Sequence, residues 1–213
     1  MNPAPDAGTI FIVDDDASFL RSISRLLRAA GYAVQVFESA EKFLAQLGPD
    51  LSGCVVVDLQ MPGLDGLELQ AALAASVNPL PVVFLSAEGD IPTTVQAMRH
   101  GAEDFLTKLA PKDQLLDAIR RALARAAQER QQREARRELR GRFAALSRRE
   151  LEVLAHVVRG QLNKQIADDL GIHERTVKLH RTNLKEKLRV QSVADLARMV
   201  EAAGIFEGDR RAE

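Results

Sequence analysis

The sequence predicts an α/β domain built on a doubly wound, five-stranded parallel sheet, followed by an all-α helix-turn-helix domain. Two observations support this fold class. Between residues 9 and 127, short apolar runs alternate with segments whose apolar residues recur at helical spacing. From Phe143 onward the helical spacing continues without a strand pattern. We therefore expect domains at residues 9–127 and 143–206, joined by a helical basic linker at residues 128–142.

Five apolar runs define the strands of the first domain, at residues 10–13, 34–37, 55–57, 82–85 and 105–107. Helices are predicted at residues 20–30, 39–47 and 67–75. Two more helices follow, one with Pro92 in its first turn and one that begins after Pro111. Gly31 offers a left-handed stop to the first helix, and Ser39 is a suitable N-cap for the second. Repeated strand–helix units indicate a parallel sheet with helices on both faces.

The charge is unevenly distributed along the 213 residues. Residues 1–119 hold 7 basic and 16 acidic side chains, residues 120–142 hold 9 and 3, and residues 143–213 hold 13 and 11. An acidic first domain and a basic linker favour different partners for the two halves of the chain.

Composition also bears on the compartment. A single cysteine, Cys54, excludes an internal disulfide and suits a reducing compartment. The first eight residues are polar, without the apolar core of a signal peptide, and no apolar stretch approaches the roughly 20 residues of a membrane helix. We expect a cytoplasmic protein that does not contact the membrane.

Four of the predicted strands end at polar side chains, namely Asp14 with Asp15, Asp58, Ser86 and Lys108. Sites in parallel sheets form at the carboxyl ends of the strands, so these side chains should meet at one edge. A divalent cation would relieve the repulsion between the carboxylates, and Mg²⁺ prefers such oxygen ligands. We expect Asp15 and Asp58 as direct ligands, Asp14 as a ligand through water, and the backbone carbonyl of Gln60 as a further ligand.

If these strand ends meet, Asp58 has the cation site and the counter-charge that a phosphate-accepting carboxylate requires. A carboxylate can attack an activated phosphoryl group to form an acyl phosphate. Lys108 and the metal would neutralise charge on the transferring oxygens, and the Ser86 hydroxyl can donate to one of them.

Residues 9–127 resemble the receiver domain of two-component response regulators, a flavodoxin-like fold. The resemblance rests on Val13-Asp14-Asp15, Val57-Asp58-Leu59-Gln60-Met61-Pro62-Gly63, Leu85-Ser86-Ala87 and Asp104-Phe105-Leu106-Thr107-Lys108. It implies that Asp58 is the phosphoacceptor of a sensor histidine kinase, and that Ser86 and Phe105 are the paired switch residues.

The residue after Lys108 departs from the family. Receivers usually place a proline there, in a cis peptide bond, whereas this chain has Leu109. A cis bond before a non-proline residue costs about 2.5–4 kcal/mol, against about 0.5–1 kcal/mol before proline. We therefore expect a trans bond between Lys108 and Leu109.

The linker is predicted to be helical because residues 112–140 contain neither Gly nor Pro and are rich in good helix formers. We expect it to end at Gly141. Residues 124–138 lack large apolar side chains, so a coiled coil is unsupported. Two interpretations of the linker remain open. It is either a solvated spacer or a basic arm that also attracts DNA phosphates.

Capping and turn residues divide the second domain into helices. Ser147 and Glu150 have the spacing of a capping box and open a helix that ends at Gly160. Asn163 is expected to cap a short helix. A turn at residues 171–173 then leads to a long helix at residues 174–188, and a last helix follows at residues 193–203. The short helix, turn and long helix form a helix-turn-helix, whose second helix enters the major groove.

Three segments of this domain resemble the LuxR-type DNA-binding domain, namely Leu146-Ser147-Arg148-Arg149-Glu150, Asn163-Lys164-Gln165-Ile166-Ala167 and Arg175-Thr176-Val177-Lys178-Leu179-His180. The resemblance implies that Lys178 and Leu179, with Thr182, read bases. The expected phosphate contacts are Asn163, Lys164, Thr176 and Arg181, and Arg175 adds to the basic face presented to DNA. Phosphate contacts position such a domain, and base contacts give it sequence specificity.

Together, the two domains resemble a response regulator of the FixJ/NarL type, which implies a transcription regulator and not an enzyme. Phosphorylation of Asp58 would favour a homodimer, formed through the fourth helix and fifth strand of the receiver, and promoter binding. RNA polymerase is a further partner that this class implies.

Two other functions are compatible with parts of this sequence. An aspartyl-phosphate phosphatase also uses a strand-end aspartate, but it needs a second aspartate two positions later, where this chain has Gln60. A regulator that binds DNA without phosphorylation remains the minor alternative, favoured by Leu109 and disfavoured by the acidic cluster.

Overall fold

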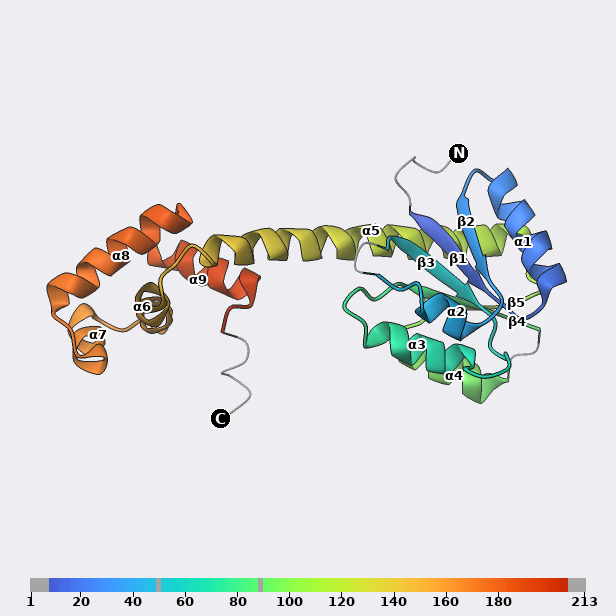
Figure 1. The fold of residues 1–213 in the computed structure, drawn as a ribbon, viewed down its shortest axis with the longest axis horizontal. Coiled ribbons are helices and arrows are strands. Elements are labelled where there is room, and N and C mark those ends of the chain that lie inside the picture. The colour runs from blue at the N-terminus through green and yellow to red at the C-terminus, as the bar shows by residue number, and fades with distance from the viewer. Residues whose placement is uncertain (1–7, 49–50, 88–89, 207–213) are drawn as a thin grey trace. The chain divides into compact units, whose positions relative to one another are not determined.

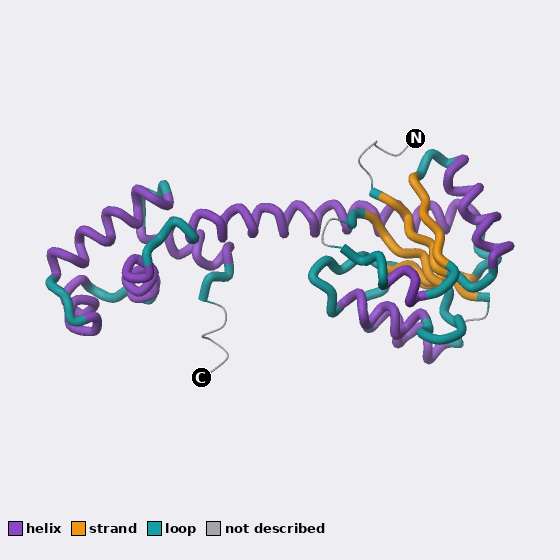
Figure 2. Tube along the Cα trace, viewed as in Figure 1, coloured by secondary structure: helices purple, strands orange, loops and turns teal. Residues whose placement is uncertain are grey.

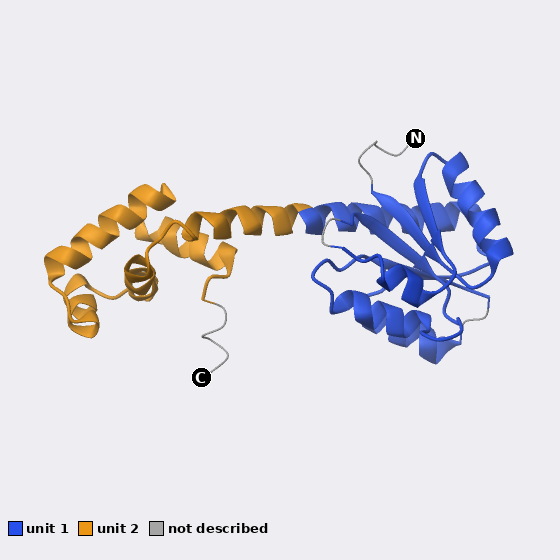
Figure 3. Ribbon diagram, in the orientation of Figure 1, with its two compact units in different colours: residues 1–130 blue, residues 131–213 orange. Residues whose placement is uncertain are grey.

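The computed structural model describes residues 8–48, 51–87 and 90–206 (Figure 1). The chain divides into two compact units, residues 1–130 and residues 131–213 (Figure 3). Helix α5 (Lys112–Phe143) begins in unit 1 and ends in unit 2. Among the described residues, no helix combines the length and the apolarity needed to cross a membrane.

Unit 1 is built on a five-stranded parallel sheet of order β2-β1-β3-β4-β5 (Figure 1). Its strands are β1 (Thr9–Val13), β2 (Ala33–Phe37), β3 (Gly53–Val57), β4 (Val82–Ser86) and β5 (Asp104–Thr107). The predicted doubly wound α/β fold is thereby confirmed, with each strand within two residues of its predicted bounds.

Helices cover both faces of the sheet. One core joins alternate strand residues such as Ile10 and Ile12 to α1 (Ala17–Ala29) and α5. The other core joins Phe11 and Val13 to α2 (Ala40–Leu44), α3 (Gly66–Ala74) and α4 (Ile91–Arg99). Because side chains alternate across a strand and both faces are covered, the central strands are apolar except for Thr9 at the start of β1 and Ser86 at the end of β4.

Helix α2 begins as predicted but ends earlier. The Ser39 hydroxyl accepts from the Lys42 N–H at 3.3 Å, as an N-cap does. The predicted end at residue 47 is wrong, because the chain tightens after Leu44. The Gln46 and Leu47 N–H groups bond to carbonyls three residues earlier, which closes the last turn.

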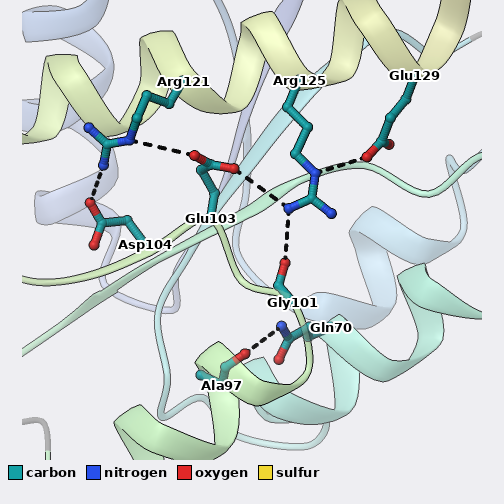
Figure 4. A network of polar contacts seen from close by, with 8 residues as sticks. All are labelled: Gln70, Ala97, Gly101, Glu103, Asp104, Arg121, Arg125 and Glu129. Atoms are coloured by element: carbon teal, nitrogen blue, oxygen red, sulfur yellow. Dashed lines mark hydrogen bonds and ion pairs between the residues drawn. The ribbon is translucent and has the colours of Figure 1, made fainter.

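Ion pairs connect β5 and its preceding turn to α5 (Figure 4). Arg121 Nη2 lies 2.5 Å from Asp104 Oδ2, and its Nε lies 3.5 Å from Glu103 Oε1. Arg125 Nη1 lies 3.6 Å from Glu103 Oε2 and donates to the Gly101 carbonyl. Each arginine is about half exposed, and such pairs contribute about 0–1 kcal/mol. The network therefore adds little to the stability of the unit.

The described part of unit 2 consists of helix and loop (Figure 2). After α5, its helices are α6 (Arg148–Val158), α7 (Asn163–Leu170), α8 (Glu174–Leu188) and α9 (Val193–Ala203). The Ser147 capping box is confirmed, with the Ser147 hydroxyl accepting from the Glu150 N–H and the Glu150 carboxylate accepting from the Ser147 N–H. Gly171, with φ at 64°, makes the left-handed turn between α7 and α8.

Two predicted helix ends in this region are wrong. Helix α5 does not end at Gly141 but continues to Phe143, which is buried in the core of unit 2. Burying this ring offsets the cost of about 1 kcal/mol for a glycine inside a helix. Asn163 is not the cap of α7 but its first residue. The preceding Leu162 N–H is instead satisfied by the Gln165 side chain, at 2.8 Å.

Candidate functional site

The strand register brings the polar strand ends together. Val13 is level with Val57 in the β1–β3 pair, so Asp14 and Asp58 follow at the same height. Oxygens of the carboxylates of Asp14, Asp15 and Asp58 lie within 4.8 Å of one another. Asp14 and Asp58 are buried, at 1% and 7% exposure, whereas Asp15 is exposed. The carboxyl edge of the sheet thus forms an acidic pocket from these three residues.

Lys108 bridges the two buried carboxylates. Its Nζ lies 2.6 Å from Asp14 Oδ2 and 2.8 Å from Asp58 Oδ2. Burial disfavours the charge on Lys108, but the hydrogen bonds and the charges of both carboxylates outweigh it and raise the pKa of the ammonium. Burial also raises the pKa of Asp14, against the opposing effect of Lys108. The ammonium therefore stays charged beside Asp58 at neutral pH.

The backbone of Lys108 is set by its neighbouring strand. Its N–H donates to the Ser86 carbonyl at 2.8 Å, which continues the β4–β5 ladder by one residue. The described residues contain no cis peptide bond, so the bond to Leu109 is trans, as predicted. The Leu109 side chain is 92% exposed. The loop therefore presents Lys108 to the pocket without a proline.

The two predicted switch residues lie on adjacent strands. Ser86 ends β4 and is 2% exposed, and Phe105 lies in β5 and is half-buried. The Phe105 ring stacks on Phe84, with ring centroids 5.6 Å apart and planes inclined by 22°. Ser86 thus ends the strand next to β3, which Asp58 follows, and Phe105 lies on the strand beyond it.

The pocket offers ligands of the type that Mg²⁺ takes. Carboxylate oxygens are hard donors, and Asp15 presents one from the exposed rim while Asp58 presents another from the floor. Asp14 is already engaged by Lys108 and accepts from the Asp16 N–H at 2.9 Å, which suits a ligand that acts through water. Gln60 lies exposed in the loop after β3. The donor set fits a magnesium ion.

Gly66 is a residue of this site that the sequence patterns did not single out. A Cβ at this position would lie 2.4 Å from the Asp58 carbonyl oxygen and 3.0 Å from the Phe84 ring. The first turn of α3 therefore packs directly against the backbone of Asp58. In the sequence, Gly66 is marked only by its position directly after Asp65, which is the N-cap of α3.

The predicted DNA-contacting residues lie on α7 and α8. Val177, Leu184 and Leu188 face the core of unit 2. The opposite surface of these helices carries the exposed side chains of Lys164, Arg175, Lys178, Leu179 and Thr182. Leu179 is 58% exposed and lies between the exposed Lys178 and the half-buried His180 on α8.

The remaining three of these residues are half-buried. Arg181 Nη1 donates to Asn163 Oδ1 at 3.1 Å, which connects α8 to the start of α7. Thr176 lies near the start of α8, in its first turn. Arg181 and Asn163 thus form one polar group at the surface, and sequence spacing alone did not indicate this contact.

The fold and site define a class: a parallel α/β domain with a lysine-bridged acidic pocket, joined to a helix-turn-helix domain. The family model described as response regulator receiver domain matches residues 10–120, and that of bacterial regulatory proteins, luxR family, matches residues 144–200. The chain belongs to the response regulators that combine a receiver domain with a LuxR-type DNA-binding domain. This family consists of transcriptional regulators, and the resemblance drawn from the motifs is confirmed.

Individual relatives match along most of the chain. It is 43% identical over 195 residues to the response regulator protein TodT of Pseudomonas putida, covering 92% of this chain and 86% of TodT. It is 40% identical over 205 residues to the transcriptional regulatory protein FixJ of Azorhizobium caulinodans, covering 96% and 97%. The solved structure of the response regulator StyR is similar, with a TM-score of 0.74 and 47% identity over 91% of this chain and 98% of StyR.

Proposed function

We propose that this protein is a cytoplasmic transcription regulator that a sensor histidine kinase phosphorylates on Asp58, and that the phosphorylated form dimerises and binds promoter DNA. The observation that carries the proposal is the Lys108 ammonium placed 2.8 Å from Asp58 in a pocket with two further carboxylates. Beside the buried Asp58 carboxylate, this arrangement places the positive charge of Lys108 and carboxylates that can bind a metal ion, as phosphoryl transfer requires.

In the proposed transfer, a carboxylate oxygen of Asp58 attacks the phosphorus of a phosphohistidine. The new bond is O–P, and the broken bond is P–N, whose electron pair stays on the imidazole. Lys108 balances charge on the phosphoryl oxygens, and the Ser86 hydroxyl donates to one of them. A magnesium ion bound by Asp15, Asp58 and the Gln60 carbonyl, with Asp14 through water, would supply a second positive charge to those oxygens.

Helix α4 offers a surface for the proposed dimer. Its apolar residues Ile91, Val95 and Met98 recur at helical spacing and are 79%, 42% and 44% exposed. Ala97 is its buried residue, and Gln70 of α3 donates to the Ala97 carbonyl at 3.0 Å (Figure 4). The exposed apolar face of α4 suits a second copy of the receiver.

Dimerisation would couple two DNA-binding units. Linked binding raises affinity without new contacts, by roughly two to four orders of magnitude when the geometry permits. A complete switch from inactive to active needs about 5.5 kcal/mol of differential stabilisation. On each unit, Lys178, Leu179 and Thr182 are the proposed base-reading residues.

Footprinting on duplexes selected from a random pool tests this proposal. We expect protection at much lower protein concentration, at least about tenfold, when Mg²⁺ and acetyl phosphate are present. The Asp58→Asn variant should show no such response. Equal protection with and without the phosphodonor would favour the minor alternative, a regulator that binds DNA without phosphorylation.

Replacing Lys178 with alanine should change base preference. A side chain that contacts base edges contributes about 1–3 kcal/mol of discrimination, so Lys178→Ala should weaken specific binding roughly tenfold and relax the selected sequence at one position. Lys164→Ala is the matched control, since loss of a phosphate contact should weaken all sequences alike. Sequence selection with both variants checks this, and an unchanged preference in Lys178→Ala would move base reading to another residue.

A further inference from the structure

The aromatic ring of Phe19 lies against the ammonium group of Lys108. The Lys108 Nζ is 4.5 Å from the centroid of this ring, within the range of a cation–π interaction. We propose that Phe19 is a positioning residue that holds the Lys108 ammonium at the acidic pocket during phosphoryl transfer. This inference rests on the proposed function of Asp58.

The position of Phe19 follows directly from the end of β1. Asp16 caps helix α1, and its Oδ1 accepts from the N–H groups of Ser18 and Phe19, at 2.7 and 3.2 Å. The Phe19 side chain is partly buried against the core that α1 and α5 share with the sheet. The backbone and the ring of Phe19 are therefore held in place about one helical turn after Asp14 and Asp15.

The loop that carries Lys108 is partly exposed to solvent. The backbone N–H of Lys108 is held by Ser86, but the next residue, Leu109, is 92% exposed and leaves that side of the loop in solvent. The lysine side chain is flexible, and its ammonium depends on contacts at its end. The ring supplies one of these contacts on a side chain that is only 16% exposed, where cation–π attraction is strengthened by desolvation.

The ring contact also differs in kind from the two carboxylate contacts. Transfer changes Asp58 from a carboxylate into an acyl phosphate, and Asp14 is also a proposed ligand through water for the metal. Phe19 takes part in neither event, so its contact with Lys108 can persist from the free pocket to the phosphorylated one. It adds no negative charge to a pocket that already holds three carboxylates.

Two substitutions distinguish the effect of the aromatic face from the effect of side-chain size, and they test this inference. Phe19→Leu keeps an apolar side chain but removes the aromatic face, and Phe19→Tyr keeps the face. With acetyl phosphate and Mg²⁺, we expect the initial rate of phosphorylation to fall about three- to tenfold in Phe19→Leu and to recover in Phe19→Tyr. Tyr32→Leu is the matched control, because Tyr32 packs against the same core as Phe19. Its rate should equal that of the wild type.

A double-mutant cycle with Lys108→Met separates positioning from packing. If Phe19 acts through Lys108, Phe19→Leu should cause no further loss of rate in the Lys108→Met background. A loss of equal size in both backgrounds would assign Phe19 a packing role and overturn the inference.

Nuclear magnetic resonance gives a readout that does not depend on transfer. In the metal-free protein, the ring current of Phe19 should shift the Lys108 ε-methylene protons upfield, and Phe19→Leu should abolish that shift. An absent shift in the wild type, or a wild-type rate in Phe19→Leu, would overturn the inference while leaving Asp58 as the acceptor. A wild-type protein that takes up no phosphoryl group would instead overturn the proposed function, and the inference with it.

Discussion

Replacing Asp58 with asparagine should abolish phosphorylation. Incubation of the wild-type protein with Mg²⁺ and acetyl phosphate should add a single phosphoryl group, and intact-protein mass spectrometry measures it. An amide is a far poorer nucleophile than a carboxylate and cannot form the acyl phosphate. The fold should persist in Asp58→Asn, because Lys108 retains its contact with Asp14 at 2.6 Å.

The control for this experiment is Asp113→Asn, which makes the same change at an exposed carboxylate in the first turn of α5. It should be phosphorylated like the wild type. Phosphorylation that survives in Asp58→Asn would place the acceptor elsewhere, and Asp14 and Asp15 would then be the residues to substitute next.

Glu150→Gln should destabilise unit 2 by about 2 kcal/mol. Glu150 is 3% exposed, and its Oε2 accepts from Lys187 Nζ at 2.8 Å and from the Ser147 N–H at 2.8 Å. The neutral amide loses the ion pair between α6 and α8 and leaves Lys187 without its charged partner. We expect the midpoint of thermal unfolding of unit 2 to fall by roughly 10 °C. Circular dichroism measures the midpoint, and hydrogen exchange of α6 and α8 assigns the transition to this unit.

The effect of Glu150→Gln should depend on pH. Burial opposes the charge on Glu150, but hydrogen bonds from Lys187 and Ser147 outweigh it and lower the pKa of Glu150 from 4.5 to about 2. A lowered pKa means that the stabilisation is fully present above the ordinary value and is lost as the pH falls toward about 2. The wild type and Glu150→Gln should therefore converge in stability over this range.

Glu186→Gln serves as the matched control, since Glu186 is exposed on α8 and its substitution should change the midpoint little. A difference between the wild type and Glu150→Gln that stays constant down to about pH 2 would contradict the assigned role of the Glu150 charge.

The sheet and most helix boundaries were predictable from sequence because they depend on local patterns. Strands covered on both faces must be apolar throughout, so β3 and β4 stand out as runs of buried residues. Capping at Ser39 and Ser147 depends on residues within one helical turn. Three helix ends were predicted wrongly. Helix α2 ends before residue 47 because its last turn tightens, and α5 passes Gly141 because Phe143 is buried in the core of unit 2. Helix α7 begins at Asn163 because the Gln165 side chain satisfies the preceding Leu162 N–H.

The candidate site was predictable in composition but not in contacts. The order of polar residues at strand ends identified Asp58, Ser86 and Lys108, since parallel strands bring their carboxyl ends to one edge. No spacing rule indicated that Lys108 would bridge Asp14 and Asp58, of which Asp58 lies 50 residues away in sequence and Asp14 still farther. The approach of Gly66 to the Asp58 backbone was equally invisible.

By itself, the sequence determined the succession of strands and helices and the kinds of side chain at the sheet edge, because strand and helix periodicity and capping act over a few residues. Only the tertiary structure decided which groups touch: the Lys108 ammonium with two carboxylates and the Phe19 ring, and Glu150 with Lys187. These contacts depend on how helices pack on a sheet and on one another, and side chains adopt them only when distant parts of the chain are brought within a few ångströms.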